Sequence, residues 1–447
     1  MRIRSFLMCA AALLLCGCSM NVAVENLLTP PKLTDEQTQI YRALINSVGS
    51  DVKLKYPKSG DFRSAFVLYN IDDEPGDEAL VFYENKSVQS GESSLRLKIL
   101  DKNDGAWSAV YDLACVGSEV ESISFADIGD TDTVEIIVRY TMLNQTEKSF
   151  SVLNYIGGIP VELYASSYSC LEVMDLNSDG VDELVSVVTD KVNQVSTAMM
   201  FTNSSTDGFS KLSEVQLGGA AADYGSITKG LLREGLSALF LDYSKAPGQY
   251  GTDVLYCYGN RLVSPDGIGS VSGSSIISRF TNDYMSEVSC SDIDGDGFIE
   301  IPSTAPLPGY ETLTRPEQLC AVQWYTVTDD NFVLEHYSYY SSKYRFALLF
   351  PNRWRGVVSA VVNYTDNEII FISYDAAGAG LEVNPATELM RIRAVDKDDE
   401  AGLAAAGHMR VIGETEETIY CCLETTGYKT GKLALTESEL MNSFIIL

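Results

Sequence analysis

The chain has 447 residues, which is long for one ordinary domain and predicts two or three. Its hydrophobic fraction of 45% excludes a wholly disordered protein, and its apolar runs are dominated by β-branched and aromatic residues, so we expect mainly strands. Acidic residues number 62 against 32 basic ones, a formal charge of −30. So acidic a chain repels nucleic acid and anionic lipid headgroups at long range, and no nucleic-acid partner is expected.

The first residues predict export. Arg2 and Arg4 precede an apolar run, Phe6–Leu15, that is too short to span a bilayer as a helix and is typical of a signal peptide. The following Leu15-Cys16-Gly17-Cys18 resembles the bacterial lipobox, whose final cysteine is lipidated and becomes the mature N-terminus. The resemblance implies a signal peptide at residues 1–17, a lipid on Cys18, and an extracytoplasmic chain anchored to a bacterial membrane. The alternative is an ordinary secretory signal.

Cleavage after residue 17 leaves 30 basic and 62 acidic side chains, a charge of −32 that suits cations or basic partners. It also leaves seven unmodified cysteines. Their odd number and the absence of CxxC spacing make a poor disulfide framework and a poor zinc site. Because most lie in apolar strand-like runs, we expect them in the core. They are Cys115, Cys170, Cys257, Cys290, Cys320, Cys421 and Cys422.

Residues 18–32 are expected to be a tether. In residues 33–59 the sequence predicts a helix and a lead-in to the first repeat. Thr34 and Gln37 have the spacing of a capping box, an apolar face follows, and Gly49 supplies the stop.

Residues 60–344 repeat one scheme, an apolar strand, an acidic turn and a second apolar strand. Four acidic turns begin at Asn70, Asp127, Asp175 and Asp292, at intervals of 57, 48 and 117 residues. Because 117 is close to twice 57, a copy without acids is expected near residue 233. Each interval has room for two more strands. The sequence therefore predicts a β-propeller-like array of about five four-stranded repeats. A β-solenoid is the weaker alternative, since its repeats are normally much shorter.

Residues 345–447 show longer strands and predict a separate C-terminal α+β domain. One helix is expected at about 397–406, and another starts at Thr436, with Glu439 completing a capping box. The opening Phe350-Pro351-x-x-Trp354 is similar to that of small PsbP-like domains.

Two turns have the ligand spacing of a calcium loop. Alternating oxygen side chains on a tight turn converge on one point, and a carbonyl at position seven and a carboxylate at position nine complete a set of hard ligands. In the third repeat the ligands are expected to be Asp175, Asn177, Asp179, the Val181 carbonyl and Glu183. In the fifth repeat they are expected to be Asp292, Asp294, Asp296, the Phe298 carbonyl and Glu300.

The first turn offers a weaker set, Asn70, Asp72, Glu74 and Glu78, with Pro75 where the bend favours Gly. The second turn has Gly129 and Thr131 at two ligand positions, which argues against calcium there. The turns begin like EF-hand or dockerin loops, but those families place an acid at position twelve, which is Ser186 or Ser303 here. Position-nine acids between strands resemble the FG-GAP and VCBS-type repeats of integrin-like β-propellers, and imply that fold with bound Ca²⁺. The competing interpretation is a solvated acidic hairpin.

Evidence for an enzyme is lacking in the sequence. Its two histidines, His336 and His408, lie in different predicted domains and are expected to be structural, and no GxSxG, HExxH or phosphate loop occurs. The tyrosines from Tyr337 to Tyr344 could stack on sugars, but alternating strand positions explain them more simply. We expect a non-enzymatic binding, adhesion or structural lipoprotein with an extracytoplasmic protein or glycan partner. The alternative is a glycan-active enzyme with catalytic groups on propeller loops.

Overall fold

The computed structural model describes most of the chain from residue 33 onward. The described ranges are 33–72, 74–85, 94–131, 133–142, 147–218, 221–264, 288–328, 331–375, 377–378, 380–424 and 431–447. They belong to two compact units, Met1–Val120 and Glu121–Leu447, which we treat separately. The expected signal peptide, the tether and the lipidation site at Cys18 lie outside the described residues.

The first unit begins with helix α3 (Asp35–Val48). The predicted capping box is confirmed, since the Gln37 amide donates to Thr34 Oγ1 at 3.1 Å and the Thr34 amide donates to Gln37 Oε1 at 3.1 Å. Ile40 and Leu44 are fully buried, in one cluster with side chains of the neighbouring sheet. The helix therefore covers one face of that sheet.

The sheet of the first unit has five strands in the order β1-β3-β4-β5, with β2 also paired to β3. β3 is central and its residues 78–83 are all buried, as expected for a strand covered on both faces. β1, which precedes the first predicted repeat, belongs to this sheet, so the first repeat has five strands and not four. The strands are β1 (Val52–Leu54), β2 (Phe66–Tyr69), β3 (Glu78–Asn85), β4 (Leu95–Asn103) and β5 (Ala106–Ala114).

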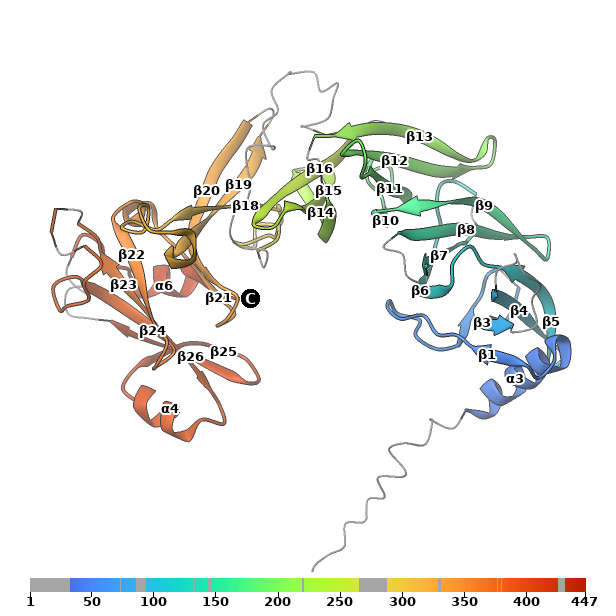
Figure 1. Ribbon diagram of the computed structural model, residues 1–447, viewed down its shortest axis with the longest axis horizontal. Coiled ribbons are helices and arrows are strands. Elements are labelled where there is room, and N and C mark those ends of the chain that lie inside the picture. The colour runs from blue at the N-terminus through green and yellow to red at the C-terminus, as the bar shows by residue number, and fades with distance from the viewer. Residues whose placement is uncertain are drawn as a thin grey trace, which may run out of the picture. The chain divides into compact units, whose positions relative to one another are not determined.

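The second unit opens with three four-stranded sheets whose strands pair in sequence order (Figure 1). The first contains β6 (Glu119–Ala126), β7 (Glu135–Thr141), β8 (Lys148–Ile156) and β9 (Ile159–Tyr168). The next contains β10 (Cys170–Met174), β11 (Glu183–Asp190), β12 (Val195–Ser204) and β13 (Gly208–Leu217). The third contains β14 (Asp223–Arg233), β15 (Leu236–Ala246), β16 (Gln249–Tyr258) and β17 (Arg261–Val263).

The expected repeat without an acidic turn is confirmed in the sheet of β14 to β17. β14 and β15 are joined by a two-residue turn, Glu234 and Gly235, and Gly235 has φ of 69°. A tight hairpin of this kind needs positive φ, which glycine adopts without strain. The acids of the other turns are therefore not needed to connect the first two strands of a repeat.

The fifth sheet departs from the four-stranded scheme. Its strand order is β18-β19-β20-β21-β27, and the strand expected before the acidic turn is reduced to a single bridge between Ser291 and Glu300. A short 3-10 helix, η2 (Arg315–Glu317), precedes β19. The strands are β18 (Ile301–Pro306), β19 (Cys320–Thr328), β20 (Asn331–Ser341), β21 (Phe346–Leu349) and β27 (Phe444–Ile446).

The last sheet has the order β22-β23-β24-β26-β25. The two helices predicted in this part of the chain are present as α4 and α6. The predicted capping box of Thr436 and Glu439 forms at the start of α6. The elements are η3 (Asn352–Trp354), β22 (Val358–Asn363), β23 (Glu368–Ser373), β24 (Glu388–Asp396), α4 (Glu400–Ala406), β25 (Arg410–Glu414), β26 (Thr418–Glu424) and α6 (Glu437–Ser443).

The domain boundary expected at residue 345 is corrected by the strand pairing. β21 and β27 extend the sheet of β18 to β20, with Phe346 opposite Ile446. One core cluster joins Tyr339 of β20 to Phe371 of β23 and Phe444 of β27. Packing therefore continues across residue 345, because the end of the chain returns to complete the fifth sheet.

The tyrosines considered as a sugar platform belong to that core. Tyr337, Tyr339 and Tyr344 are at most 9% exposed and lie in the same cluster, so their rings are covered by protein. The seven cysteines expected in the core are all buried. Both observations fit the simpler sequence interpretation.

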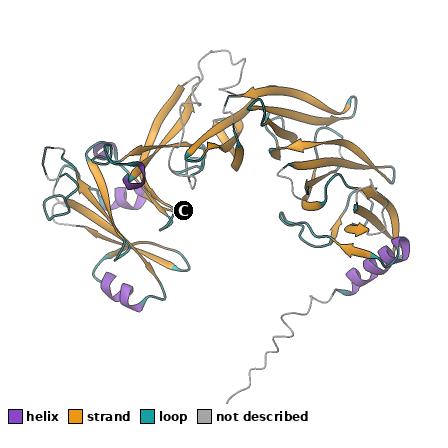
Figure 2. Ribbon diagram, in the orientation of Figure 1, coloured by secondary structure: helices purple, strands orange, loops and turns teal. Residues whose placement is uncertain are grey.

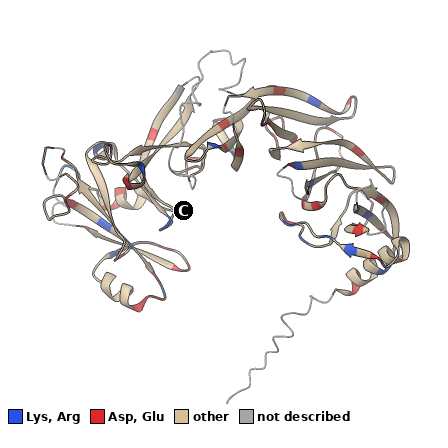
Figure 3. Ribbon diagram, viewed as in Figure 1, with Lys and Arg blue, Asp and Glu red and all other residues tan. Residues whose placement is uncertain are grey.

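Strands dominate the described chain, and helices are confined to short segments (Figure 2). Lys, Arg, Asp and Glu are scattered along the strands, most of whose length is uncharged (Figure 3). Among the described helices, none is long and apolar enough to cross a membrane. The fold is thus mainly β, built of four- and five-stranded antiparallel sheets with open strand orders.

The return of β27 predicts that residues on both sides of position 345 unfold together. Phe444 is 9% exposed, and its ring centroid lies 5.3 Å from those of Phe346 and Tyr420. Phe444→Ala should cost about 3–5 kcal/mol in the free energy of unfolding, because it opens a cavity in the shared core. Met441→Ala, on the exposed side of α6, should change stability by less than about 0.5 kcal/mol. Denaturant unfolding with equal losses for the two variants would contradict this packing.

Candidate cation-binding turns

Four turns precede the second strand of their repeats and share one buried hydrogen bond. Each has a glutamate at its ninth position, Glu78, Glu135, Glu183 or Glu300, that is no more than 3% exposed. In every case Oε2 accepts the backbone amide of the second turn residue, at 2.8 to 3.0 Å. The glutamate therefore holds the turn through one oxygen, and only the other oxygen is available to a cation. The spacing alone did not reveal this division of labour.

In the fifth turn the remaining side chains are fixed by backbone amides. Asp292 Oδ1 accepts the amides of Gly295 and Asp296 at 2.7 and 3.0 Å, and its Oδ2 accepts that of Gly297 at 2.9 Å. Asp294 Oδ1 accepts the Asp296 amide at 3.1 Å, and Asp296 Oδ1 accepts the Phe298 amide at 2.8 Å. These bonds anchor both oxygens of Asp292 and one oxygen each of Asp294 and Asp296 to the turn.

The carboxylates of the fifth turn converge. Asp292, Asp294 and Glu300 each offer an oxygen, and these atoms lie within 4.8 Å of one another. Glu300 Oε1 is buried and no described residue donates a hydrogen bond to it. Burial and the nearby charges of Asp294 and Asp296 raise the pKa of Glu300 to about 8. A buried carboxylate oxygen that lies near other negative charges destabilises the folded chain unless a cation or a proton binds to it.

Two predicted ligands of the fifth turn lie outside that group. Asp296 is exposed on the turn, and Phe298 is half-buried, with a parallel bridge to Leu231 of β14. Asp294 has a partner that sequence spacing could not reveal, since its Oδ2 lies 2.9 Å from Nε2 of His336 on β20. His336 is thus a structural contact of the turn, consistent with the role expected for it.

The third turn repeats the backbone pattern of the fifth. Asp175 accepts the amides of Asp179 and Gly180 at 3.0 and 2.9 Å, and Asp179 Oδ1 accepts that of Val181 at 3.0 Å. Asn177 Oδ1 accepts the Asp179 amide at 2.9 Å. The two turns therefore have one conformation, including positive φ at the fourth and sixth positions, where Ser178 and Gly180 stand.

The third turn differs from the fifth in the group at its third position. Asn177 Nδ2 donates to Asp179 Oδ2 at 2.9 Å and to Asn260 Oδ1 at 3.2 Å. The first of these bonds partly compensates the negative charge of the Asp179 carboxylate. Burial, followed by the charge of Asp179, raises the pKa of Glu183 to about 7. Asn177, Asp179, Val181 and Glu183 line a cavity of about 280 Å³. Four of the five predicted ligands of this turn therefore border a common space, and Asp175 is not among the residues that line it.

The second turn satisfies its glutamate without a cation. Glu135 Oε1 accepts Asn154 Nδ2 at 2.7 Å, Asn203 Nδ2 at 2.9 Å and Thr133 Oγ1 at 3.3 Å. A Cβ on Gly129 would lie 1.8 Å from the Asn203 carbonyl oxygen, so only glycine fits against the neighbouring strand β12. Three neutral donors stand here in place of the acids that the other turns supply.

The first turn does not reproduce the pattern of the third and fifth. Asn70 donates through Nδ2 to the Glu74 carbonyl at 3.0 Å, and Asp72 Oδ1 accepts the Glu74 amide at 3.0 Å. Pro75 replaces the glycine that bends the other turns, and positive φ moves to Gly76. Glu78 keeps the buried bond common to all four turns. Among the described residues this turn brings no group of three carboxylates together.

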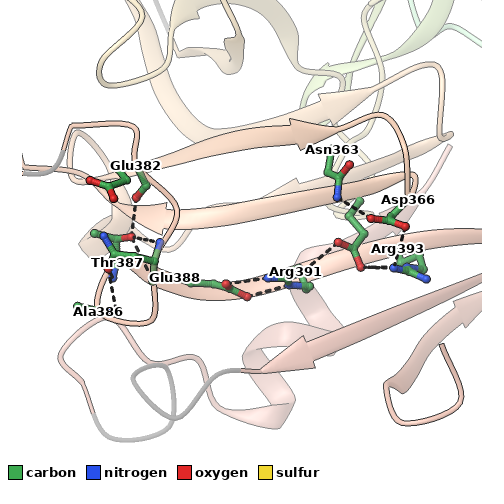
Figure 4. A network of polar contacts seen from close by, with 10 residues as sticks. Asn363, Asp366, Glu382, Ala386, Thr387, Glu388, Arg391 and Arg393 are labelled. Atoms are coloured by element: carbon green, nitrogen blue, oxygen red, sulfur yellow. Dashed lines mark hydrogen bonds and ion pairs between the residues drawn. The ribbon is translucent and has the colours of Figure 1, made fainter. Parts of the chain in front are cut away.

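A second polar constellation lies on β23 and β24, which sequence reasoning missed (Figure 4). Arg391 bonds both oxygens of Glu388 and Oε2 of Glu368, while Arg393 bonds Glu368 Oε1 at 2.6 Å. Every carboxylate oxygen of the two glutamates has an arginine donor. Such saturated groups stabilise the pairing of neighbouring strands and are not free to transfer protons.

No protein-family model and no curated protein sequence matches the chain. Among solved structures it is similar to a hypothetical selenium-binding protein from Sulfolobus tokodaii, at 10% identity and a TM-score of 0.26, over 46% of this chain and 54% of that one. This chain thus spans about half the length of that protein. It is also similar to Sqt1 from Saccharomyces cerevisiae, at 10% identity and a TM-score of 0.30, over 77% and 81% of the two chains. An exotype rhamnogalacturonan lyase, YesX, matches at 11% identity and a TM-score of 0.25, over 70% and 60%. Similarities this slight support no argument on fold or activity.

Because side-chain amides compensate the buried charge of Glu135, the stability that the second turn contributes should not depend on added cations. Asn203→Leu leaves buried Glu135 with fewer donors, and should cost about 1–3 kcal/mol in the free energy of unfolding, with or without a chelator. Asn193→Ala, in the exposed β11–β12 turn, is the control and should have little effect. Denaturant titrations in which calcium rescues Asn203→Leu would show that this reading of the turn is wrong.

Proposed function

We propose that the protein is an extracytoplasmic, lipid-anchored β-propeller-like protein that binds calcium in its fifth and third turns and acts as a binding, adhesion or structural module at a bacterial cell envelope. The observation that carries the calcium proposal is the buried Glu300 Oε1, which has no described donor and lies with oxygens of Asp292 and Asp294. Oxygen-only ligands on a bent loop suit calcium better than magnesium, which demands a stricter octahedron.

The two turns are proposed to bind with different affinities. The fifth turn offers four carboxylates, whereas the third has the neutral Asn177 in place of Asp294. Affinity in calcium loops rises with ligand charge and rigidity, so the fifth turn is the tighter site. The second turn is proposed to bind none, since its amides occupy the oxygen a cation would need.

We propose that the sheets form a propeller because the sequence repeats, and the successive four-stranded sheets support this arrangement. A binding role is favoured over an enzymatic one because the strongest polar cluster away from the turns has its carboxylates saturated by Arg391 and Arg393. The partner is proposed to be an extracytoplasmic protein or glycan, which the strongly acidic charge restricts to neutral or basic surfaces.

The calcium proposal predicts a stability that follows calcium concentration. Calcium should add about 2.7 kcal/mol to the free energy of unfolding at a hundredfold excess over Kd of one site, and magnesium should add less. Calorimetry should resolve two sites, of which Glu300→Gln removes the tighter and Glu183→Gln the weaker. The two variants are matched, since both keep the buried acceptor for the turn amide. An absence of binding heat, with melting unchanged by chelator, would refute the proposal.

The anchor is tested separately at Cys18. Cys18→Ala should release the protein from the membrane fraction or leave it as an uncleaved precursor, because no acyl chain can then be attached. Fractionation of cells with an immunoblot measures both outcomes, and Cys16→Ala is the control that keeps the modified position. Normal processing and full membrane retention of Cys18→Ala would exclude the lipoprotein assignment.

A further inference from the structure

The fifth turn forms part of the contact between two sheets. The Ile299 amide donates to the Leu231 carbonyl of β14 at 3.0 Å, and Leu231 and Phe298 form a parallel bridge. A Cβ on Gly230 would come within 2.5 Å of the Ile299 side chain, so β14 lies directly against the turn. The downstream end of the turn is therefore attached to the sheet of β14 to β17.

The upstream end of the turn is attached to the same sheet. The Cys290 amide donates to Asp242 Oδ2 at 3.0 Å, and the Cys290 carbonyl accepts Thr228 Oγ1 at 3.0 Å. The Cys290 thiol is 2% exposed and lies 3.3 Å from Asp242 Oδ1. A single core cluster contains Phe240 and Val254 together with Cys290 and Ile299. Both ends of the turn thus contact the sheet of β14 to β17.

The segment between these two contacts carries Asp292, Asp294 and Asp296, and Glu300 follows directly. Without a cation their charges repel one another within a few residues, which favours opening of the turn. The contact also has room to separate, because a cavity of about 250 Å³ lies between Asp242 and Thr252 on one side and Val288 and Pro302 on the other. Opening of the turn therefore loosens both of its contacts with the neighbouring sheet.

We propose that a cation bound in the fifth turn controls the junction between the sheet of β14 to β17 and the part of the chain from residue 288 onward, closing it when bound and loosening it when removed. This inference rests on the proposed calcium binding and gives that site a regulatory role. The third turn contacts the same sheet through two side-chain hydrogen bonds, between Ser178 Oγ and Ser237 Oγ at 3.3 Å and from Asn177 Nδ2 to Asn260 Oδ1 at 3.2 Å, and the proposal does not extend to it.

Cys290 reports on the junction directly. In the full-length chain, its reaction with N-ethylmaleimide under native conditions is followed by mass spectrometry of the Cys290 peptide. If calcium binds only the closed junction, the open fraction falls by the factor 1 + [Ca²⁺]/Kd, so modification should slow by up to about 100-fold at a hundredfold excess over Kd. Cys422, 1% exposed in the sheet of β22 to β26, is the internal control for unfolding of the whole chain, and calcium should slow the modification of Cys290 by a larger factor than that of Cys422.

Matched variants assign the effect to one turn. Glu300→Gln should abolish the calcium dependence at Cys290, whereas Glu183→Gln should retain it. If Glu300→Gln fails to fold, seen as rapid modification of Cys422, Asp294→Asn replaces it, because that carboxylate lies at the surface and its amide acceptor is kept.

The outcomes separate this inference from the proposed function. Calorimetric calcium binding at the fifth turn, with Cys290 modified equally fast in calcium and in chelator, overturns the junction and leaves the calcium site standing. Acceleration of Cys290 and Cys422 by the same factor in chelator indicates global unfolding alone and also overturns it. No calcium binding by calorimetry removes both proposals.

Discussion

A buried glutamate carboxylate closes each of the acidic turns on itself, and the chemistry of each turn follows from what its second oxygen meets. The first oxygen does the same work in all four, accepting the amide at the second position of the turn. The second oxygen of Glu135 meets three neutral donors, whereas that of Glu300 meets none among the described residues. Burial of an anion is costly, so each turn needs its own compensation. Neighbouring residues, and not the glutamate, decide whether that compensation comes from the chain or from solution.

The turns also contact the neighbouring sheets. The way in which the charge of each turn glutamate is compensated therefore affects the packing between the sheets of the second unit. Ile128 of the second turn forms a parallel bridge with Asp182 of the third, and the Gly129 amide donates to the Asp182 carbonyl at 3.1 Å. Leu231 and Phe298 make the corresponding contact between the fourth and fifth sheets. A turn that changes shape therefore moves the contact between sheets as well as its own strands.

Features that depend on neighbouring residues could be predicted from the sequence. Thr34 and Gln37 form a capping box because only three residues separate them, and alternating oxygen side chains predict turns because each one accepts a nearby amide. The repeat without acids near residue 233 followed from the spacing of the others. Glu78, Glu183 and Glu300 were recognised by position, but the bond to the backbone that they share with Glu135 was not.

Contacts between distant residues could not be predicted. Asn203 reaches Glu135 across 68 residues, and His336 reaches Asp294 across 42. The boundary at residue 345 failed for the same reason, since β27 pairs with β21 across about a hundred intervening residues. The alternation of charge on β24 was visible in the sequence, but its partner Glu368 on β23 is defined only by strand register.

The buried cysteines affect what happens to the protein once it has unfolded. Seven cysteine thiols are buried in the described chain, and burial raises the pKa of several of them, so in the folded state they are protonated and shielded from oxidants. Unfolding exposes these thiols to water, where an oxidant can link them within and between chains. Refolding in air therefore competes with this oxidation, and where oxidation wins, the lifetime of the protein is set by its unfolding rate and not by its equilibrium stability.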